Sequence, residues 1–262
     1  MNVLLPSALG SAYKSPPQKA RVITEAWALE NLFCPACPED HLSATRGSTK
    51  AVDFQCPACR QQFQLKAKSS HFGSRVVDGA YSTMLSAMAS NSAPSLCLMH
   101  YDIVGWRARN LMVIPHFALP PSAILQRRPL SSSARRAGWV GCFIKLGNVP
   151  VDAKIIIIRE GIPLPAESVR QQFARLQPLR ELSLNERGWT LDVLNEVRKL
   201  GKAEFTNAEI YERAPGLADL HPENRHVTDK IRQQLQFLRD RGFLIHVKRK
   251  HWRLTAAFSP AS

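Results

Sequence analysis

The pattern of apolar and polar positions predicts mixed helices and strands in the N-terminal two thirds of the chain. Apolar residues at helical spacing predict two helices there, and short apolar runs predict three buried strands. The third of these strands is a run of four isoleucines, whose branched side chains favour a central strand. The predicted elements lie at residues 19–32, 80–89, 95–101, 111–115 and 155–158. Helices mixed with strands indicate an α/β or α+β fold for residues 1–182.

The pattern changes after about residue 183, where helical periodicity predominates. Helices are predicted at residues 189–200, 206–213 and about 223–241, followed by a hairpin over residues 243–254. Ile231, Leu235 and Leu238 lie on one face of the last helix. Helices followed by a hairpin with a basic tip are typical of a winged helix, so residues 183–262 are predicted to form a winged-helix DNA-binding domain.

A hairpin is predicted from residue 51 to residue 66, with strands at 51–55 and 62–66. Because strand side chains alternate between faces, Val52, Phe54, Phe63 and Leu65 should form the core side. The opposite face should then carry the polar set Asp53, Gln64 and Lys66.

Asp53, Gln64 and Lys66 together suit the hydrolysis of a phosphodiester. An aspartate and an amide oxygen can bind Mg²⁺, which polarises the phosphate and activates water. The ammonium of Lys66 can stabilise the charge that develops on the phosphate. The same three residues also suit a solvated outer face without chemistry, and Glu25 on the preceding helix is better explained as an exposed residue than as a further ligand.

Four of the six cysteines form two C-x-x-C pairs. Their spacing, C-x2-C-x18-C-x2-C, predicts a tetrahedral structural zinc site with the ligands Cys34, Cys37, Cys56 and Cys59. Four thiolates leave no open coordination position, so the zinc should be structural rather than catalytic. Cys97 and Cys142 stand alone among apolar residues and are predicted to be small core residues.

The chain is strongly basic, with a formal net charge of +14. Residues 1–182 hold 21 Lys and Arg against 11 Asp and Glu, and residues 183–262 hold 14 against 10. Nucleic acid is the expected partner, and both parts of the chain should contact its phosphates. We expect no membrane span and no secretory signal, and therefore a cytoplasmic location. No obligate protein partner is expected either.

The hairpin residues 51–54 and 63–66 resemble the core motif of the PD-(D/E)XK nucleases. The chain as a whole is similar to the DpnI family of methyl-directed type II restriction endonucleases. The similar segments run from near the start of the chain to its final helix, at residues 13–15, 18–21, 78–81, 134–139, 187–190 and 230–235.

The resemblance implies a PD-(D/E)XK nuclease domain with a four-cysteine zinc site, followed by a winged helix. It implies Mg²⁺-dependent cleavage of double-stranded DNA at GATC sites that contain N6-methyladenine. Asp53, Gln64 and Lys66 take the catalytic positions, and Asp53 and Gln64 would bind the Mg²⁺. The family has Glu where this chain has Gln64, which removes one negative charge from the metal site.

Candidate DNA-reading residues occur in both parts of the chain. Arg135 and Arg136 can bind phosphate or guanine, and the resemblance places Trp139 against the methyl group of adenine, whereas Trp residues in general are more often core. Residues at the start of a recognition helix reach base edges, and residues at a wing tip contact phosphate. The C-terminal candidates are Asn224, Arg225, His226, Thr228, Lys230, Arg232, Gln233, Lys248, Arg249 and Lys250.

Two other functions fit the same pattern. A non-catalytic DNA-binding protein or regulator with a zinc ribbon and a winged helix matches the composition, and Gln64 favours it. A nuclease with a different sequence or methyl preference is the other.

Overall fold

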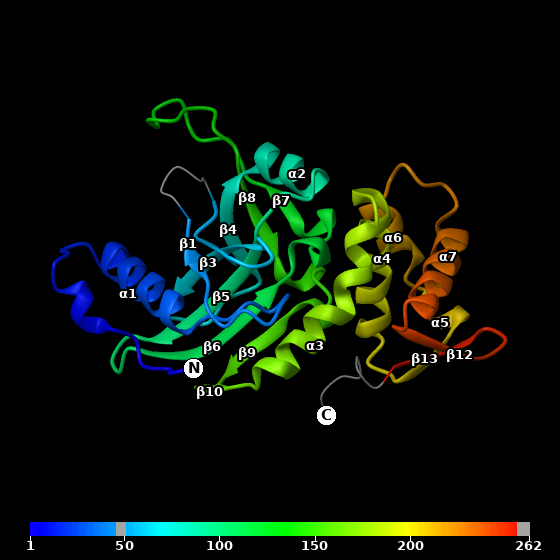
Figure 1. The fold of residues 1–262 in the computed structure, drawn as a ribbon. Helices are drawn as coiled ribbons and strands as arrows, with labels where there is room; N and C mark the ends of the chain where they lie inside the picture. Colours follow the sequence, from blue (N-terminus) through cyan, green and yellow to red (C-terminus); the bar gives the residue numbers. More distant parts are fainter. Residues whose placement is uncertain (46–50, 256–262) are drawn as a thin grey trace.

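A computed structural model describes residues 1–45 and 51–255 of the chain (Figure 1). A seven-stranded sheet of order β1-β2-β3-β5-β6-β9-β10 forms the centre of the N-terminal part. Strands β3 and β5 are parallel, and the other neighbours in this sheet are antiparallel. The strands span Ser43–Ala44 (β1), Phe54–Gln55 (β2), Gln62–Lys68 (β3), Ser95–Asp102 (β5), Arg107–Ile114 (β6), Ile155–Arg159 (β9) and Ile162–Pro163 (β10).

A second, antiparallel sheet of order β4-β8-β7 lies against the β3–β5 part of the large sheet. Helix α2 contacts β4 and β7, helix α1 packs on β3, and helix α3 packs on β9. The second sheet and α2 leave a cavity against β3 and β5. These elements span Arg75–Ala80 (β4), Gly141–Lys145 (β8), Ile124–Gln126 (β7), Pro16–Asn31 (α1), Tyr81–Ala89 (α2) and Ala166–Leu176 (α3).

The local sequence explains why α1 and β9 form where they do. Helix α1 begins at Pro16, whose fixed φ suits the first turn of a helix. It then buries Ile23 and Trp27, four residues apart, on one face. Strand β9 places Ile155, Ile157 and Ile158 in the core, where branched side chains pack well on a pleated surface.

The C-terminal part is a helix-turn-helix unit with a β-hairpin wing, as the sequence predicts. Its three-stranded sheet has the order β11-β13-β12, and its longest helices, α4 and α7, pack against each other. Helix α7 buries Ile231, Leu235 and Leu238, the face identified from periodicity. The elements span Leu184–Lys199 (α4), Glu204–Thr206 (β11), Asn207–Tyr211 (α5), Ala214–Leu220 (α6), Val227–Asp240 (α7), Leu244–Lys248 (β12) and His251–Leu254 (β13).

Helix α4 also packs on the N-terminal part of the chain. Arg198 and Asp152 form a buried ion pair, with side chains 5% and 2% exposed. The carboxylate of Asp192 accepts hydrogen bonds from Ser122 Oγ at 2.5 Å and bonds His221 Nε2 at 2.9 Å. The predicted division at residue 182 therefore precedes a helix that both parts share.

The predicted hairpin forms, but its first strand is shorter than expected. Strand β2 contains only Phe54 and Gln55, whereas a strand was predicted from residue 51. Ala51 has a φ of 64°, a left-handed conformation that no continuous strand accommodates. The prediction for residues 51–53 is therefore wrong, and part of the predicted polar loop, residues 46–50, lies outside the described residues.

No helix within residues 1–45 and 51–255 is both long enough and apolar enough to cross a bilayer.

Candidate active site

Four cysteine thiols converge at the turn of the β2–β3 hairpin, which carries Cys56 and Cys59. Their Sγ atoms all lie within 4.8 Å of one another, with Cys34 and Cys59 at 3.6 Å and Cys37 and Cys56 at 3.5 Å. A tetrahedron with Zn–S bonds of about 2.3 Å has S–S edges of about 3.8 Å. The four sulfurs therefore fit one Zn²⁺, and in the described part of the chain no other group of three or more His, Cys, Asp or Glu side chains is arranged to hold a metal ion.

The backbone around the thiols favours their charged form. Ala36 N–H donates to Cys34 Sγ and Cys59 N–H donates to Cys56 Sγ, both at 3.4 Å. Burial raises the pKa of the Cys34 thiol, because a thiolate without a counter-charge is costly in a closed site. A dication bound to the thiolates would offset that cost.

Arg170 of α3 holds the first cysteine knuckle against the large sheet. Its Nε donates to the carbonyl of Cys34 at 3.2 Å, and its Nη2 donates to the carbonyls of Pro38 and Glu39 at 3.1 and 3.2 Å. The same guanidinium lies over the ring of Phe33, 5.2 Å from its centroid. The knuckle is thus fixed by a residue more than a hundred positions further along the chain.

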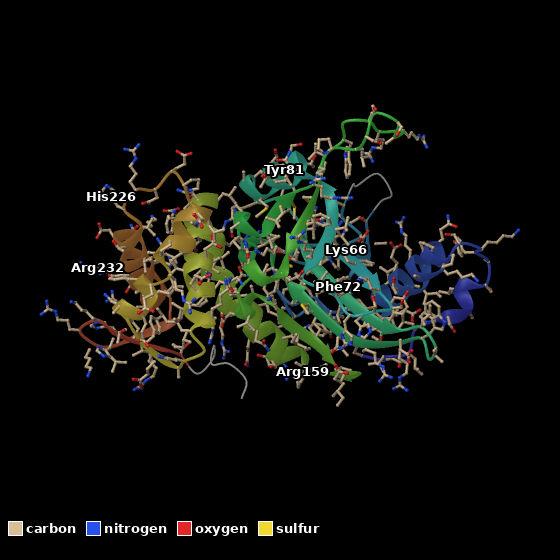
Figure 2. The ribbon with its side chains drawn as sticks, turned by 180° about the vertical axis from the view of Figure 1, so that it is seen from behind. Lys66, Phe72, Tyr81, Arg159, His226 and Arg232 are labelled. Atoms are coloured by element: carbon tan, nitrogen blue, oxygen red, sulfur yellow. The ribbon has the colours of Figure 1, made fainter. Side chains whose placement is uncertain are left out.

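A cavity of about 760 Å³ lies between the large sheet and the second sheet. Gln62, Gln64 and Lys66 alternate along β3 and line one wall of it. Figure 2 shows Lys66 near the middle of the N-terminal part. The strand therefore presents Gln64 and Lys66 on one face, as alternation predicts.

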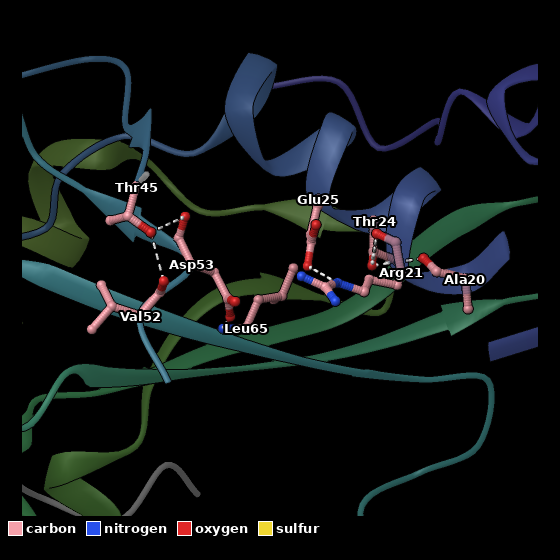
Figure 3. Close-up of polar contacts among 8 residues, drawn as sticks. All are labelled: Ala20, Arg21, Thr24, Glu25, Thr45, Val52, Asp53 and Leu65. Atoms are coloured by element: carbon pink, nitrogen blue, oxygen red, sulfur yellow. Dashed lines mark hydrogen bonds and ion pairs between the residues drawn. The ribbon is translucent and has the colours of Figure 1, made fainter. Parts of the chain in front are cut away.

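Asp53 lies beside this wall and is not among the described residues that line the cavity. Its carboxylate Oδ2 accepts a hydrogen bond from Leu65 N–H at 2.8 Å, so it touches the residue between Gln64 and Lys66 (Figure 3). Thr45 N–H donates to the carbonyl of Asp53. Asp53, Gln64 and Lys66 were predicted to share one face. Gln64 and Lys66 both line the cavity, whereas Asp53 lies beside it.

The turn at Ala51 is the physical reason for this difference. It keeps residues 51–53 outside strand β2, so the regular alternation of β2 does not extend to them, although Asp53 N–H still donates to the carbonyl of Phe63 at 2.9 Å. Val52, which alternation assigned to the core side, is buried yet lines the cavity.

Helix α1 lies on the other side of Asp53, with Arg21 and Glu25 facing the hairpin (Figure 3). Arg21 Nε is 2.7 Å from Glu25 Oε1, and this hydrogen bond is the main reason that the pKa of Arg21 is raised, with a smaller contribution from the charge of Asp53. Glu25 is thus engaged by a neighbour on its own helix.

Asp78 is a cavity residue that the sequence did not identify. It lies on β4, and its Oδ1 is 2.8 Å from Lys66 Nζ. Its side chain is 7% exposed, against 26% for Lys66. Asp78 belongs to one of the segments similar to the DpnI family, and that was the only signal pointing to it.

His116 lies on the wall of the cavity and is 5% exposed. The Nδ1 of His116 is 3.2 Å from Gln61 Nε2. The Nε2 of His116 is buried without a hydrogen-bond partner. Burial, aided by the positive charges of Arg180 and Arg187, lowers the pKa of His116 to about 4. The imidazole is therefore neutral near pH 7.

Trp139 is half-buried and lines the cavity, with the guanidinium of Arg136 4.7 Å from its ring centroid. It is therefore not an interior core residue. A side chain on Gly141 would come within 2.8 Å of the indole, so the glycine leaves room for the ring. Arg135 is exposed on the same loop, which projects beyond β7 and β8 (Figure 1).

The C-terminal candidates lie on a separate surface. Figure 2 shows His226 and Arg232 on the C-terminal part, away from Lys66. Asn224 Oδ1 accepts the backbone N–H of His226 at 2.8 Å, and Lys230 Nζ donates to Gln233 Oε1 at 2.8 Å. Exposed to solvent are Arg225, His226, Thr228, Arg232, Gln233, Lys248, Arg249 and Lys250.

Cys97 and Cys142, the two cysteines outside the cluster, are 3% and 0% exposed, which confirms that they are core residues. Burial raises the pKa of Cys97 to about 12, so its thiol is not reactive near neutral pH.

A mixed α/β unit with a four-thiol cluster, joined to a helix-turn-helix unit, defines a two-part protein of the DNA-binding class. A model of the DpnI, Dam-replacing family matches residues 1–182, and a model of the DpnI_C, Dam-replacing HTH domain matches residues 185–253. The chain belongs to the DpnI family. Membership implies a methyl-directed restriction endonuclease whose helix-turn-helix domain binds DNA.

Proposed function

We propose that this protein hydrolyses double-stranded DNA at GATC sites that contain N6-methyladenine, in a metal-dependent reaction at the face formed by Asp53, Gln64 and Lys66. The observation that carries the proposal is the placement of Gln64 and Lys66 in one cavity, with the Asp53 carboxylate bonded to the residue between them. Metal-dependent phosphodiester hydrolysis uses oxygen ligands for a cation beside a positive charge, and the proposal assigns the ligands to Asp53 and Gln64 and the charge to Lys66.

The donor chemistry at this face fits Mg²⁺. Mg²⁺ prefers oxygen and is commonly held by one or two carboxylates together with water. Asp53 would supply a carboxylate and Gln64 an amide oxygen. When bound, the cation would polarise the phosphate and favour ionisation of water.

The side chains of the protein do the remaining work. The Lys66 ammonium, on the cavity wall, can hydrogen-bond a phosphate oxygen and stabilise the charge that grows on it. Hydrolysis adds hydroxide to phosphorus and a proton to the leaving oxygen, so Lys66 returns unchanged. The apolar part of the cavity, including Leu96 and Ile114, excludes water and strengthens these interactions.

Methyl recognition is assigned to Trp139 in this proposal. Its indole is half-exposed on the cavity wall and can cover a methyl group, which removes apolar surface from water. Arg135 and Arg136 on the same loop would contact phosphates or guanine. Arg136 already covers one face of the Trp139 indole, so only the opposite face of the ring is free to contact the DNA.

The helix-turn-helix unit would read the same class of DNA separately. Thr228, Arg232 and Gln233 lie in the first turns of α7, where side chains reach base edges. Asn224, Arg225 and His226 precede the helix, and Lys230 lies between Thr228 and Arg232. Lys248, Arg249 and Lys250 at the wing tip would contact phosphate and would give the binding a steep dependence on salt.

The test is to incubate the protein with plasmid DNA prepared with and without adenine methylation, in Mg²⁺ and in Mn²⁺. Cleavage of the methylated plasmid alone, at GATC, is the expected result. Equal cleavage of both plasmids would contradict methyl dependence and would indicate a nuclease with a different sequence or methyl preference.

A non-catalytic DNA-binding protein is the second candidate, and the observation that favours it is Gln64. Replacing the family's carboxylate by an amide removes a negative charge that a dication would use. Gln64→Glu should keep or raise Mg²⁺-dependent cleavage. If neither the parent nor Gln64→Glu cuts either plasmid with either metal, the protein is a binder and not an enzyme.

A further inference from the structure

The carboxylate that contacts Lys66 comes from a different sheet. Lys66 lies on β3 of the large sheet and Asp78 on β4 of the second sheet, and their side chains meet at 2.8 Å in the cavity wall. The Asp78 side chain is more than nine-tenths buried. A buried carboxylate is costly unless it is paired, so the ammonium of Lys66 is an integral part of this arrangement.

The backbone of β4 is irregular at this point. Asp78 pairs with Cys142 of β8, and Ala80 pairs with Gly141, so that Gly79 is an extra residue in the ladder. Such a bulge turns the neighbouring side chains relative to a regular strand and is frequent next to active sites. Here it lies directly beside the carboxylate that contacts Lys66.

A lysine side chain has four rotatable bonds, and ordering it costs conformational entropy. Lys66 is only partly buried, and its contact with Asp78 holds the Nζ in place before any DNA arrives. Charge placed in advance acts on a transition state without reorganisation at the moment of reaction.

We propose that Asp78 is a positioning residue, which holds the ammonium of Lys66 at the cavity wall beside Gln64 so that it meets the phosphate undergoing cleavage. The inference deepens the proposed function, on which it rests. Asp78 also balances the charge of Lys66, so a cation at Asp53 and Gln64 faces a neutral pair rather than a bare ammonium.

Two other roles must be separated from this one. Asp78 could tie the two sheets together without affecting Lys66, or its second oxygen could bind the cation directly. In both cases its removal would act independently of Lys66. A double-mutant cycle distinguishes a residue that acts through another from one that acts alone.

The experiment compares the parent, Asp78→Ala, Lys66→Ala and the double variant in single-turnover cleavage of a methylated duplex. The same four proteins are titrated with that duplex in Ca²⁺ by fluorescence anisotropy, which measures DNA affinity without cleavage. We expect Asp78→Ala to slow cleavage about tenfold to a hundredfold in the parent, and by less than about twofold in the Lys66→Ala background.

Two conservative variants keep the test valid if Asp78→Ala folds poorly. Asp78→Glu keeps the charge and should recover part of the lost rate, whereas Asp78→Asn keeps the shape and should not. Asp102→Ala is the matched control, because Asp102 is also a strand carboxylate close to a basic side chain, Arg109 at 3.6 Å, and it lies outside the cavity.

The outcomes distinguish the two proposals. Additive losses in an enzyme that cuts, or no loss in Asp78→Ala, would overturn the role of Asp78. If the parent cuts nothing but Asp78→Ala changes DNA affinity only when Lys66 is present, the nuclease proposal fails and the positioning role stands.

Discussion

The four-cysteine cluster and the Gln64–Lys66 face share one hairpin but depend on different parts of the chain. The cluster takes its four thiols from two C-x-x-C knuckles within 26 residues. The face takes Gln64 and Lys66 from β3, and the carboxylate that holds Lys66 from a strand in another sheet. A metal site with local ligands can form as the hairpin forms, whereas the face needs the second sheet to be in place.

This difference predicts which substitutions affect the whole hairpin and which affect only the chemistry. Loss of a thiol should destabilise both regions, because the second knuckle joins the end of β2 to the start of β3. Loss of a face residue should leave the zinc cluster intact.

The largest expected effect is that of Cys56→Ala. Structural zinc contributes on the order of 10 kcal/mol to the folding of small zinc domains, and a three-thiol site loses much of that. We expect loss of bound zinc, a lowered melting temperature and no DNA cleavage. Atomic absorption measures the zinc content, and circular dichroism measures the melting temperature. The control is Cys97→Ala, which lies outside the cluster and should retain its zinc. Full zinc content in Cys56→Ala would mean that the four thiols are not the ligands.

Lys66→Ala should lower the cleavage rate by about a thousandfold, as expected when a group that stabilises transition-state charge is removed. The melting temperature should also fall, because the buried Asp78 carboxylate loses its partner. Lys68→Ala, two residues further along β3, is the matched control and should cut at nearly the parental rate. Comparable losses in the two variants would mean that the positive charge acts non-specifically.

The cavity wall should lose stability in mild acid. Burial lowers the pKa of His116 to about 4, below the value of about 6.5 in the unfolded chain, so the unfolded state binds more protons between these values. The contribution is fully present above about pH 6.5 and is lost as the pH falls towards 4. Between pH 7.5 and pH 5 the parent should lose about 2 kcal/mol more than His116→Gln, as measured from urea unfolding. Equal losses would contradict the neutral, buried imidazole.

Arg170→Ala should have the smallest of these effects, lowering the free energy of unfolding by about 1–2 kcal/mol, because hydrogen bonds to carbonyls of the first knuckle are lost. The exposed Arg175, on the same helix, is the control. Thermal melts should show the difference, and zinc should remain bound. Zinc loss in Arg170→Ala would show that the cluster depends on distant residues as strongly as the face does.

The cluster could be predicted from spacing because its geometry is set by short loops. The C-terminal unit could be predicted because Ile231, Leu235 and Leu238 repeat at helical spacing. The shared face of Gln64 and Lys66 could be predicted from strand alternation, which holds along β3.

What the sequence did not reveal depends on tertiary contacts. Asp53 lies just before β2, two residues after the left-handed Ala51, and nothing in the local residue types indicates that turn. Asp78 reaches Lys66 only because the second sheet lies against the first, and β4, with its charged residues and its bulge, carries no strand signal. Arg170 contacts the first knuckle although it is 136 positions from Cys34 in the sequence.

The shared helix α4 has a consequence for how such proteins can evolve by exchange of modules. The two family models divide the chain just before α4, at residues 182 and 185. A recombination event at that point would give the nuclease part a new C-terminal neighbour and would leave Asp152 buried without Arg198. An unpaired buried carboxylate is strongly destabilising, so the incoming module would need an arginine at the matching position of its own first helix. The two parts are therefore separable as sequence units, but an exchange must preserve the ion pair between them.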